Sequence, residues 1–130
     1  MGLTVRIKGY EGAYNCGYIT YEMFIRRLAR LKFGDEFGNH YDAWATGYSS
    51  FDADILDSHD DDPIVDLLFA SDCEGKFTPK QCRRIYESIK DLHMDMKGHN
   101  YGDMKPYNML ERWKDMFLYC AKHRVNMYFT

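Results

Sequence analysis

Apolar and polar side chains alternate at both ends of the chain, which is the pattern of a strand with one buried face. Over residues 3–7, Leu, Val and Ile alternate with Thr and Arg before Gly9, and over residues 125–129, Val, Met and Phe alternate with Asn and Tyr. The pattern predicts one short strand at each end, and the simplest arrangement pairs the two. Because a two-stranded ribbon is marginal in water, helices must cover its apolar face.

Four stretches show the three-and-four spacing of amphipathic helices. The first covers about residues 18–33, with Gly34 as a C-terminal stop, and a short second one follows Asp62 and Pro63. The third begins at a capping box and has an apolar stripe that extends to His93 and Met96. The last runs from about 105 to 123. The capping box is formed by Thr78 and Gln81, and the apolar positions of the first helix are Tyr21, Phe24, Ile25, Leu28 and Leu31.

The segments between these elements, at residues 10–17, 34–62 and 97–103, are rich in Gly, Asn, Asp, Ser and Tyr, which is turn chemistry. The middle segment is long for a structureless loop, so it either contains a short element or forms a functional surface. With 130 residues the chain can bury one core but is too short for two ordinary domains. We expect a single α+β domain over residues 1–130, with about four helices packed on a small antiparallel or mixed sheet formed by the N- and C-terminal strands.

The segment SDCEGKFTPKQC at residues 71–82 resembles one that recurs in small uncharacterised proteins of bacteria and their phages. Those proteins are similar in placing an aromatic-rich helix first, this turn in the middle, and a helix and a strand at the end. The resemblance implies this topology and a microbial or viral origin. The resemblance assigns no catalytic residue to this chain, because those proteins have no established activity.

Charge and composition exclude several classes of protein. Seventeen Lys and Arg against twenty Asp and Glu give a net charge of -3, without the basic excess of a protein that binds duplex nucleic acid. No apolar run approaches the ~18 residues of a membrane span, and the N-terminus lacks a signal-peptide pattern. We therefore expect a cytoplasmic protein, in the host cytoplasm if viral, without membrane partners or cofactors and with its four cysteines reduced.

Candidates for catalysis and metal binding are weak. An acidic cluster spans residues 52–62, but consecutive carboxylates on a loop normally face water, and Asp62 is already a predicted helix cap. No zinc-ligand spacing, nucleophile elbow or phosphate-binding glycine loop is present. Cys82 and Cys120 lie on apolar helix stripes, where core packing is their expected role. We expect no metal site and no catalytic residue, and a metal-dependent hydrolase built on Asp52 and Asp54 ranks last.

Aromatic residues are the outlier of the composition, at 16% of the chain. Rings stack on nucleobases and guanidinium groups bind phosphates, so rings, small polar groups and arginines together suit a flat, phosphate-bearing ligand. We therefore predict a non-enzymatic protein that sequesters a small nucleotide-like signal in a pocket between the first helix and two Tyr-rich loops. The candidate ligand-binding residues are Tyr14, Asn15, Tyr18, Arg26, Arg27, Trp44, Tyr48, Ser49 and Ser50.

The same residue types also favour a second hypothesis. Interfaces between proteins are enriched in Tyr, Trp and Arg, so the chain would equally suit a protein-interaction module that inhibits a host enzyme. A small sheet with exposed edges and many rings would suit a homodimer as well.

Overall fold

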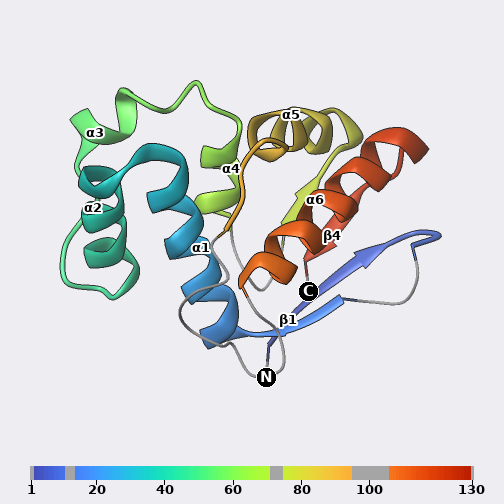
Figure 1. Ribbon diagram of the computed structural model, residues 1–130, viewed down its shortest axis with the longest axis horizontal. Coiled ribbons are helices and arrows are strands. Elements are labelled where there is room, and N and C mark those ends of the chain that lie inside the picture. The colour runs from blue at the N-terminus through green and yellow to red at the C-terminus, as the bar shows by residue number, and fades with distance from the viewer. Residues whose placement is uncertain (1, 11–13, 71–74, 95–105, 130) are drawn as a thin grey trace.

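The structure is a computed structural model that describes residues 2–10, 14–70, 75–94 and 106–129. Over these residues it has four strands and six helices (Figure 1). The order along the chain is β1 (Gly2–Ile7), β2 (Tyr14–Gly17), α1 (Tyr18–Phe33), α2 (Asp35–Ala45), α3 (Ala53–Asp57), α4 (Ile64–Leu68), β3 (Gly75–Phe77), α5 (Pro79–Ile89), α6 (Pro106–His123) and β4 (Met127–Phe129).

The four strands form one antiparallel sheet in the order β2-β1-β4-β3. The α+β class and the pairing of the terminal strands are therefore confirmed, with Val5 opposite Phe129. The two outer strands were not predicted. β2 lies in a segment assigned to turns, and β3 has only three residues, so neither has a clear alternation of its own and each is fixed by the strand beside it.

One face of the sheet is buried under helices, and the other is open. On the inner face, Trp113 of α6 lies 5.7 Å from Phe129 between ring centroids, and Phe117 lies 6.2 Å from Phe77. Phe24 of α1 stacks on the other side of Trp113 at 6.2 Å, so α1 and α6 close the core together. The inner-face strand residues are Leu3, Val5, Ile7, Tyr14, Phe77, Met127 and Phe129, all buried.

The helices predicted from spacing are present, with differences at their ends. α1 ends before Gly34, whose φ of 94° is the left-handed conformation that glycine tolerates. α5 has the predicted capping box but ends at Ile89, so His93 is exposed rather than on a buried stripe. Leu31 is 40% exposed, so its placement on the apolar face of α1 was wrong. Met96 lies outside the described residues.

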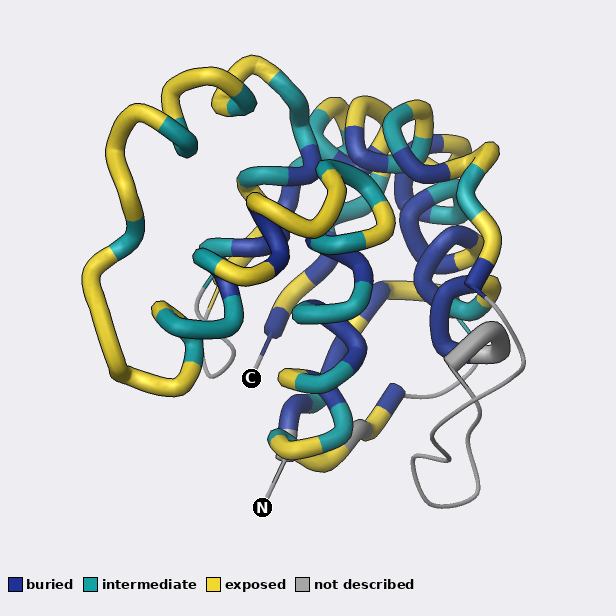
Figure 2. The backbone as a smooth tube through the Cα atoms, turned by 60° about the vertical axis from the view of Figure 1, so that its left-hand side comes forward, coloured by how far each residue is buried: buried dark blue, intermediate teal, exposed yellow. Residues whose placement is uncertain are grey.

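The middle segment, which we expected either to contain a short element or to form a functional surface, contains two helices, α2 and α3. α2 runs antiparallel beside α1, as the two adjacent helices in Figure 1 and the pairing of Arg30 with Asp35 and of Arg26 with Asp42 show. It places Phe37 and Tyr41 on one buried face, and Asp35 and Glu36 in the first turn suit the positive end of the helix dipole. Figure 2 shows that the chain between α2 and α4 is largely exposed.

No helix in the described part of the chain is long and apolar enough to span a membrane.

Candidate functional site

A hollow of about 440 Å³, partly open to solvent, lies between α1 and α2 beside the end of α4. Its wall is mostly aromatic and aliphatic and contains a single acidic side chain among the described residues. The lining residues are Tyr18, Tyr21, Glu22 and Ile25 of α1, Tyr41, Trp44 and Ala45 of α2, and Leu68 and Ala70 at and after the end of α4.

The spacing of the lining residues explains why two helices can build this wall. The α1 residues occupy positions i, i+3, i+4 and i+7, and those of α2 occupy i, i+3 and i+4. Residues at these spacings share one face of a helix. Each helix therefore contributes one continuous stripe, and the hollow lies where the two stripes meet.

The aromatic side of the wall is held in place by contacts behind it. The Tyr41 hydroxyl donates a hydrogen bond of 2.5 Å to the backbone carbonyl of Leu68. Trp44 lies 5.5 Å from Tyr41 and 4.8 Å from Phe69 between ring centroids, and it remains 38% exposed. Burial raises the pKa of Tyr41, and the nearby charge of Glu22 raises it further, so this phenol stays neutral and serves as a fixed ring.

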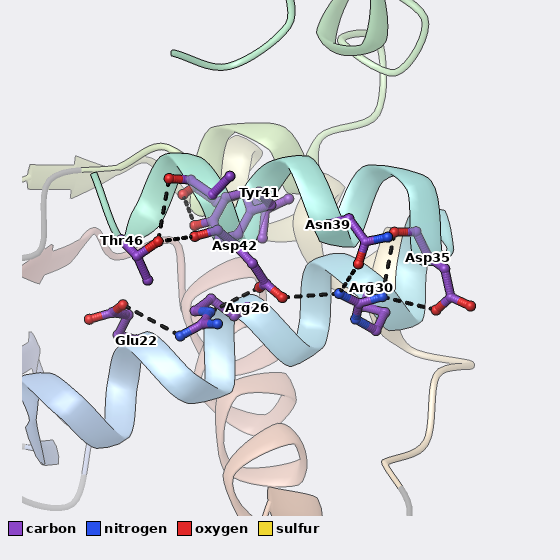
Figure 3. Close-up of polar contacts among 10 residues, drawn as sticks. Glu22, Arg26, Arg30, Asp35, Asn39, Tyr41, Asp42 and Thr46 are labelled. Carbon is purple, nitrogen blue, oxygen red and sulfur yellow. Dashed lines mark hydrogen bonds and ion pairs between the residues drawn. The ribbon is translucent and has the colours of Figure 1, made fainter. Parts of the chain in front are cut away.

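The arginines of α1 form ion pairs with α2 (Figure 3). Asp42 accepts from Arg26 Nε at 2.9 Å on one carboxylate oxygen and from Arg30 Nη2 at 3.0 Å on the other. Arg30 also donates to Asp35 at 3.0 Å and to Asn39 at 2.9 Å. These guanidinium groups join the two helices, and they are not among the residues that line the hollow.

Charge pairing shifts the ionisation of this network. Partial burial raises the pKa of Asp42, but the hydrogen bonds from Arg26 and Arg30 together outweigh burial, so the net shift is downward. The hydrogen bond to Asp42 raises the pKa of Arg26, and the bond to Asp35 does the same for Arg30. All three groups are therefore charged at neutral pH.

The structure brings two of the nine predicted ligand-binding residues to the hollow, Tyr18 and Trp44. Trp44 was expected on a loop but lies on α2. Tyr14 is buried in the sheet, with its ring 5.8 Å from that of Trp113. Asn15 lies on the open sheet face and accepts a hydrogen bond from Thr4 at 2.9 Å.

The other predicted residues do not line the hollow. Arg26 is held by Asp42, and Arg27 is half-buried on α1. Tyr48, Ser49 and Ser50 are exposed in the chain after α2, and Tyr48 is 87% exposed. The nine residues therefore do not converge on one cavity within the described part of the chain.

Sequence reasoning missed the charged member of the wall, Glu22. A signal for it was present, because Glu22 falls on the same helical stripe as Tyr18, Tyr21 and Ile25. A single carboxylate within a stripe of rings is unusual on a helix face that is to be covered. Tyr21 was assigned to the core only, although it also contributes to the wall.

The acidic segment serves to cap helices. Asp52 accepts from the backbone amides of Asp54 and Ile55 at the start of α3. Asp62 accepts from the amide of Ile64 at 3.0 Å, from the Ser88 hydroxyl at 2.6 Å, and pairs with Lys32 at 3.4 Å. Among the described residues, no three acidic, histidine or cysteine side chains come together where they could hold a metal ion.

Cys82 and Cys120 form a buried pair of free thiols between α5 and α6. The hydrogen bond between the two thiols, together with burial, raises the pKa of Cys82, and the same bond lowers that of Cys120. Neither side chain is exposed to solvent. Because an attacking thiolate must be reachable, this pair fits core packing, as its position on two apolar stripes predicted.

Comparison with protein-family models, curated proteins and solved structures finds no match to this chain. The geometry of the hollow and the chemistry of its wall therefore carry the functional proposal.

Proposed function

We propose that this chain is a non-enzymatic binding protein that captures a small flat ligand with a nucleobase-like ring in the hollow between α1 and α2. The observation that carries the proposal is the gathering of four aromatic side chains from two helices around about 440 Å³ of space. A cavity of this size lies within the range of small-molecule sites, which are mostly apolar with few polar groups. Stacking on such rings contributes ~1–3 kcal/mol per base.

The ring part of the nucleotide hypothesis has more support than the phosphate part. Tyr18 and Trp44 face the ligand space, whereas Arg26 and Arg30 already share the carboxylate of Asp42. A phosphate would have to compete with Asp42 for these guanidinium groups. Ring stacking is therefore the central element of the proposal, and phosphate binding by Arg26 is a separate element with its own test.

The test is titration calorimetry with a panel of nucleobases, nucleosides, mononucleotides and cyclic nucleotides. Trp44→Ala and Tyr18→Ala should each weaken binding by about tenfold or more, because each removes a stacking surface. Tyr48→Ala is the matched control, since this ring is 87% exposed and does not line the hollow, and it should bind as the unmodified protein does.

Two results would contradict the proposal. If no member of the panel bound, capture of a nucleobase-like ring would be abandoned. If a ligand bound but Tyr48→Ala weakened it as much as Trp44→Ala, the site would lie elsewhere. Arg26→Ala addresses the phosphate element alone, because it should weaken nucleotides more than the corresponding nucleosides.

A second candidate function, inhibition of a host enzyme through protein docking, is favoured by two exposed side chains. Tyr48 is 87% and Ile19 is 77% exposed, and large exposed side chains of this kind are typical of interface anchors. Pull-down from a bacterial lysate with the unmodified chain and with Tyr48→Ala distinguishes this function from ligand capture. Docking predicts a partner that is lost in the variant, whereas capture predicts that the variant changes nothing.

A further inference from the structure

The hollow has a negative electrostatic character. Glu22 is the one charged side chain among the described lining residues, and its carboxylate is 46% exposed. The faces of aromatic rings carry partial negative charge and attract cations, with tryptophan the most effective ring. The rings and the carboxylate of this wall therefore act in the same direction on a ligand.

The nearby arginines do not cancel this character. Arg26 Nη1 lies 3.8 Å from Glu22, whereas Arg26 Nε lies 2.9 Å from Asp42. Arg30 is bound by Asp42 and Asp35, each at 3.0 Å. The ion-pair network in Figure 3 contains two guanidinium groups and three carboxylates, so its net charge is -1. Of the three carboxylates, Glu22 has the most distant cationic partner.

Tyr41 of α2 and Glu22 of α1 line opposite walls of the same hollow. Burial raises the pKa of the Tyr41 phenol, the charge of Glu22 raises it further, and the charge of Arg26 lowers it. The Tyr41 hydroxyl is occupied by the carbonyl of Leu68. Tyr41 is only 3% exposed, so Tyr18 and Trp44 provide most of the ring surface that a ligand can reach.

We propose that the hollow selects flat organic cations over neutral rings of the same shape, with Glu22 as the counter-ion and the rings of Tyr18 and Trp44 as the cation-binding wall. This inference rests on the proposed capture function and specifies its ligand class. The ligand is a heteroaromatic ring that carries positive charge, such as an N-alkylated base.

The experiment compares pairs of probes that differ in charge but hardly in shape. Guanosine is paired with 7-methylguanosine, and quinoline with N-methylquinolinium, at a mildly acidic pH where the methylated base keeps its positive charge. Affinities are measured by calorimetry and by the fluorescence of Trp44 in the Trp113→Phe background, since the chain has two tryptophans. In each pair the cation should bind about tenfold more tightly, the ratio expected from a cation–π contact together with a partly exposed carboxylate.

Substitutions identify the source of the preference. Glu22→Gln keeps the size of the side chain and should reduce the ratio to about threefold or less, and Glu22→Lys should make the neutral probe the better ligand. Glu36→Gln is the matched control, because it removes the same charge from an exposed residue of α2 that does not line the hollow. It should leave the ratio unchanged. Far-UV circular dichroism verifies that each variant is folded.

The outcomes separate this inference from the proposed function. A cation preference that is lost with Glu22→Gln and kept with Glu36→Gln supports both. Neutral and cationic probes that bind equally, or a preference that is unaffected by Glu22→Gln and Glu22→Lys, overturn the inference and leave ring capture standing. If neither member of any pair binds, ring capture fails and the cation preference fails with it.

Discussion

At the scale of single residues, Asp42 determines what the arginines of α1 can do. Each of its two carboxylate oxygens accepts from a different guanidinium group, at 2.9 and 3.0 Å. The pairing directs Arg26 and Arg30 along the seam between α1 and α2. The sequence suggests that these arginines could bind phosphate, but in the structure they join α1 to α2 through Asp42. They do not line the hollow, where Glu22 is the one charged side chain among the described lining residues.

We predict that Asp42→Asn lowers the free energy of unfolding by about 1 kcal/mol at neutral pH, the value of a partly buried, doubly paired carboxylate. The pKa of Asp42 is depressed in the folded state. Its stabilisation is therefore present above the unfolded pKa, which is about 3.9, and is lost as the pH falls through the folded pKa. Urea unfolding at neutral pH and below about pH 3 measures the effect.

Asp35→Asn is the control for this experiment, because Asp35 also pairs with Arg30 but is 87% exposed. Asp35→Asn should lower the free energy of unfolding by less than about 0.5 kcal/mol at neutral pH. If Asp42→Asn lowered the free energy of unfolding as much at low pH as at neutral pH, the charge of the Asp42 carboxylate would not be the source of the effect.

At the scale of elements, the contact between α1 and α2 depends on a glycine. Gly38 lies inside α2, where glycine is intrinsically unfavourable, and it is buried against Arg30. A Cβ at this position would lie 2.8 Å from Arg30 Cζ and 2.9 Å from Arg30 Cβ. The second of these atoms cannot move without the backbone of α1, so the two helices approach each other as closely as they do because residue 38 lacks a side chain.

We predict that Gly38→Ala destabilises the protein by about 1–2 kcal/mol, although alanine is the better helix former. The steric cost of a methyl group in a packed contact is about 1–3 kcal/mol and exceeds the gain in helix propensity of about 1 kcal/mol. Urea denaturation measures the change. In a background of Arg30→Ala, which removes the Arg30 atoms beyond Cβ, Gly38→Ala should lower the free energy of unfolding by less. Stabilisation by Gly38→Ala would refute the close approach.

The elements differ in how far the sequence alone predicts them. Strands β1 and β4, helix α1 and the capped start of α5 follow from local patterns, namely alternation, three-and-four spacing and the reciprocal bonds of Thr78 and Gln81. Helix α2 was missed because its glycine and asparagine residues look like turn chemistry, although Gly38 is present for packing. Which helices pack against each other is decided by tertiary structure, which local sequence patterns do not specify.

The candidate site was likewise predictable only where local patterns suffice. Rings in unusual number indicated a binding surface, and Tyr18 and Trp44 do line the hollow. Glu22 was missed because a lone carboxylate on a helix is usually solvated, and its place in the wall of the hollow depends on the position of α2 beside α1. Tyr14 and Asn15 were placed with the site because β2 was taken as a loop, whereas strand alternation sends the two side chains to opposite sheet faces.

At the scale of the whole molecule, Trp113 connects the sheet with the helices that build the hollow. Its ring contacts those of Phe129 of β4 and Phe24 of α1, and its centroid lies 5.8 Å from that of Tyr21, a lining residue of the hollow. The hollow therefore rests on the same core that holds the sheet, and loosening that core should loosen the hollow as well.

We predict that Trp113→Phe lowers the free energy of unfolding by about 1–2 kcal/mol, while Trp44→Phe, the control at the 38% exposed tryptophan, changes it by less than about 0.5 kcal/mol. The loss at residue 113 stays moderate because the indole Nε1 of Trp113 is buried without a hydrogen-bond partner among the described residues. Phenylalanine removes that unsatisfied donor along with the packing surface.

The same two variants test whether the hollow and the sheet unfold together. The chain has two tryptophans, so Trp113→Phe leaves Trp44 to report on the hollow, and Trp44→Phe leaves Trp113 to report on the core. In each variant the fluorescence and far-UV circular dichroism transitions in urea should coincide, as they do for cooperative unfolding. If Trp44 reported an earlier transition than circular dichroism did, α1 and α2 would separate before the sheet, and the hollow would not depend on the core through Trp113.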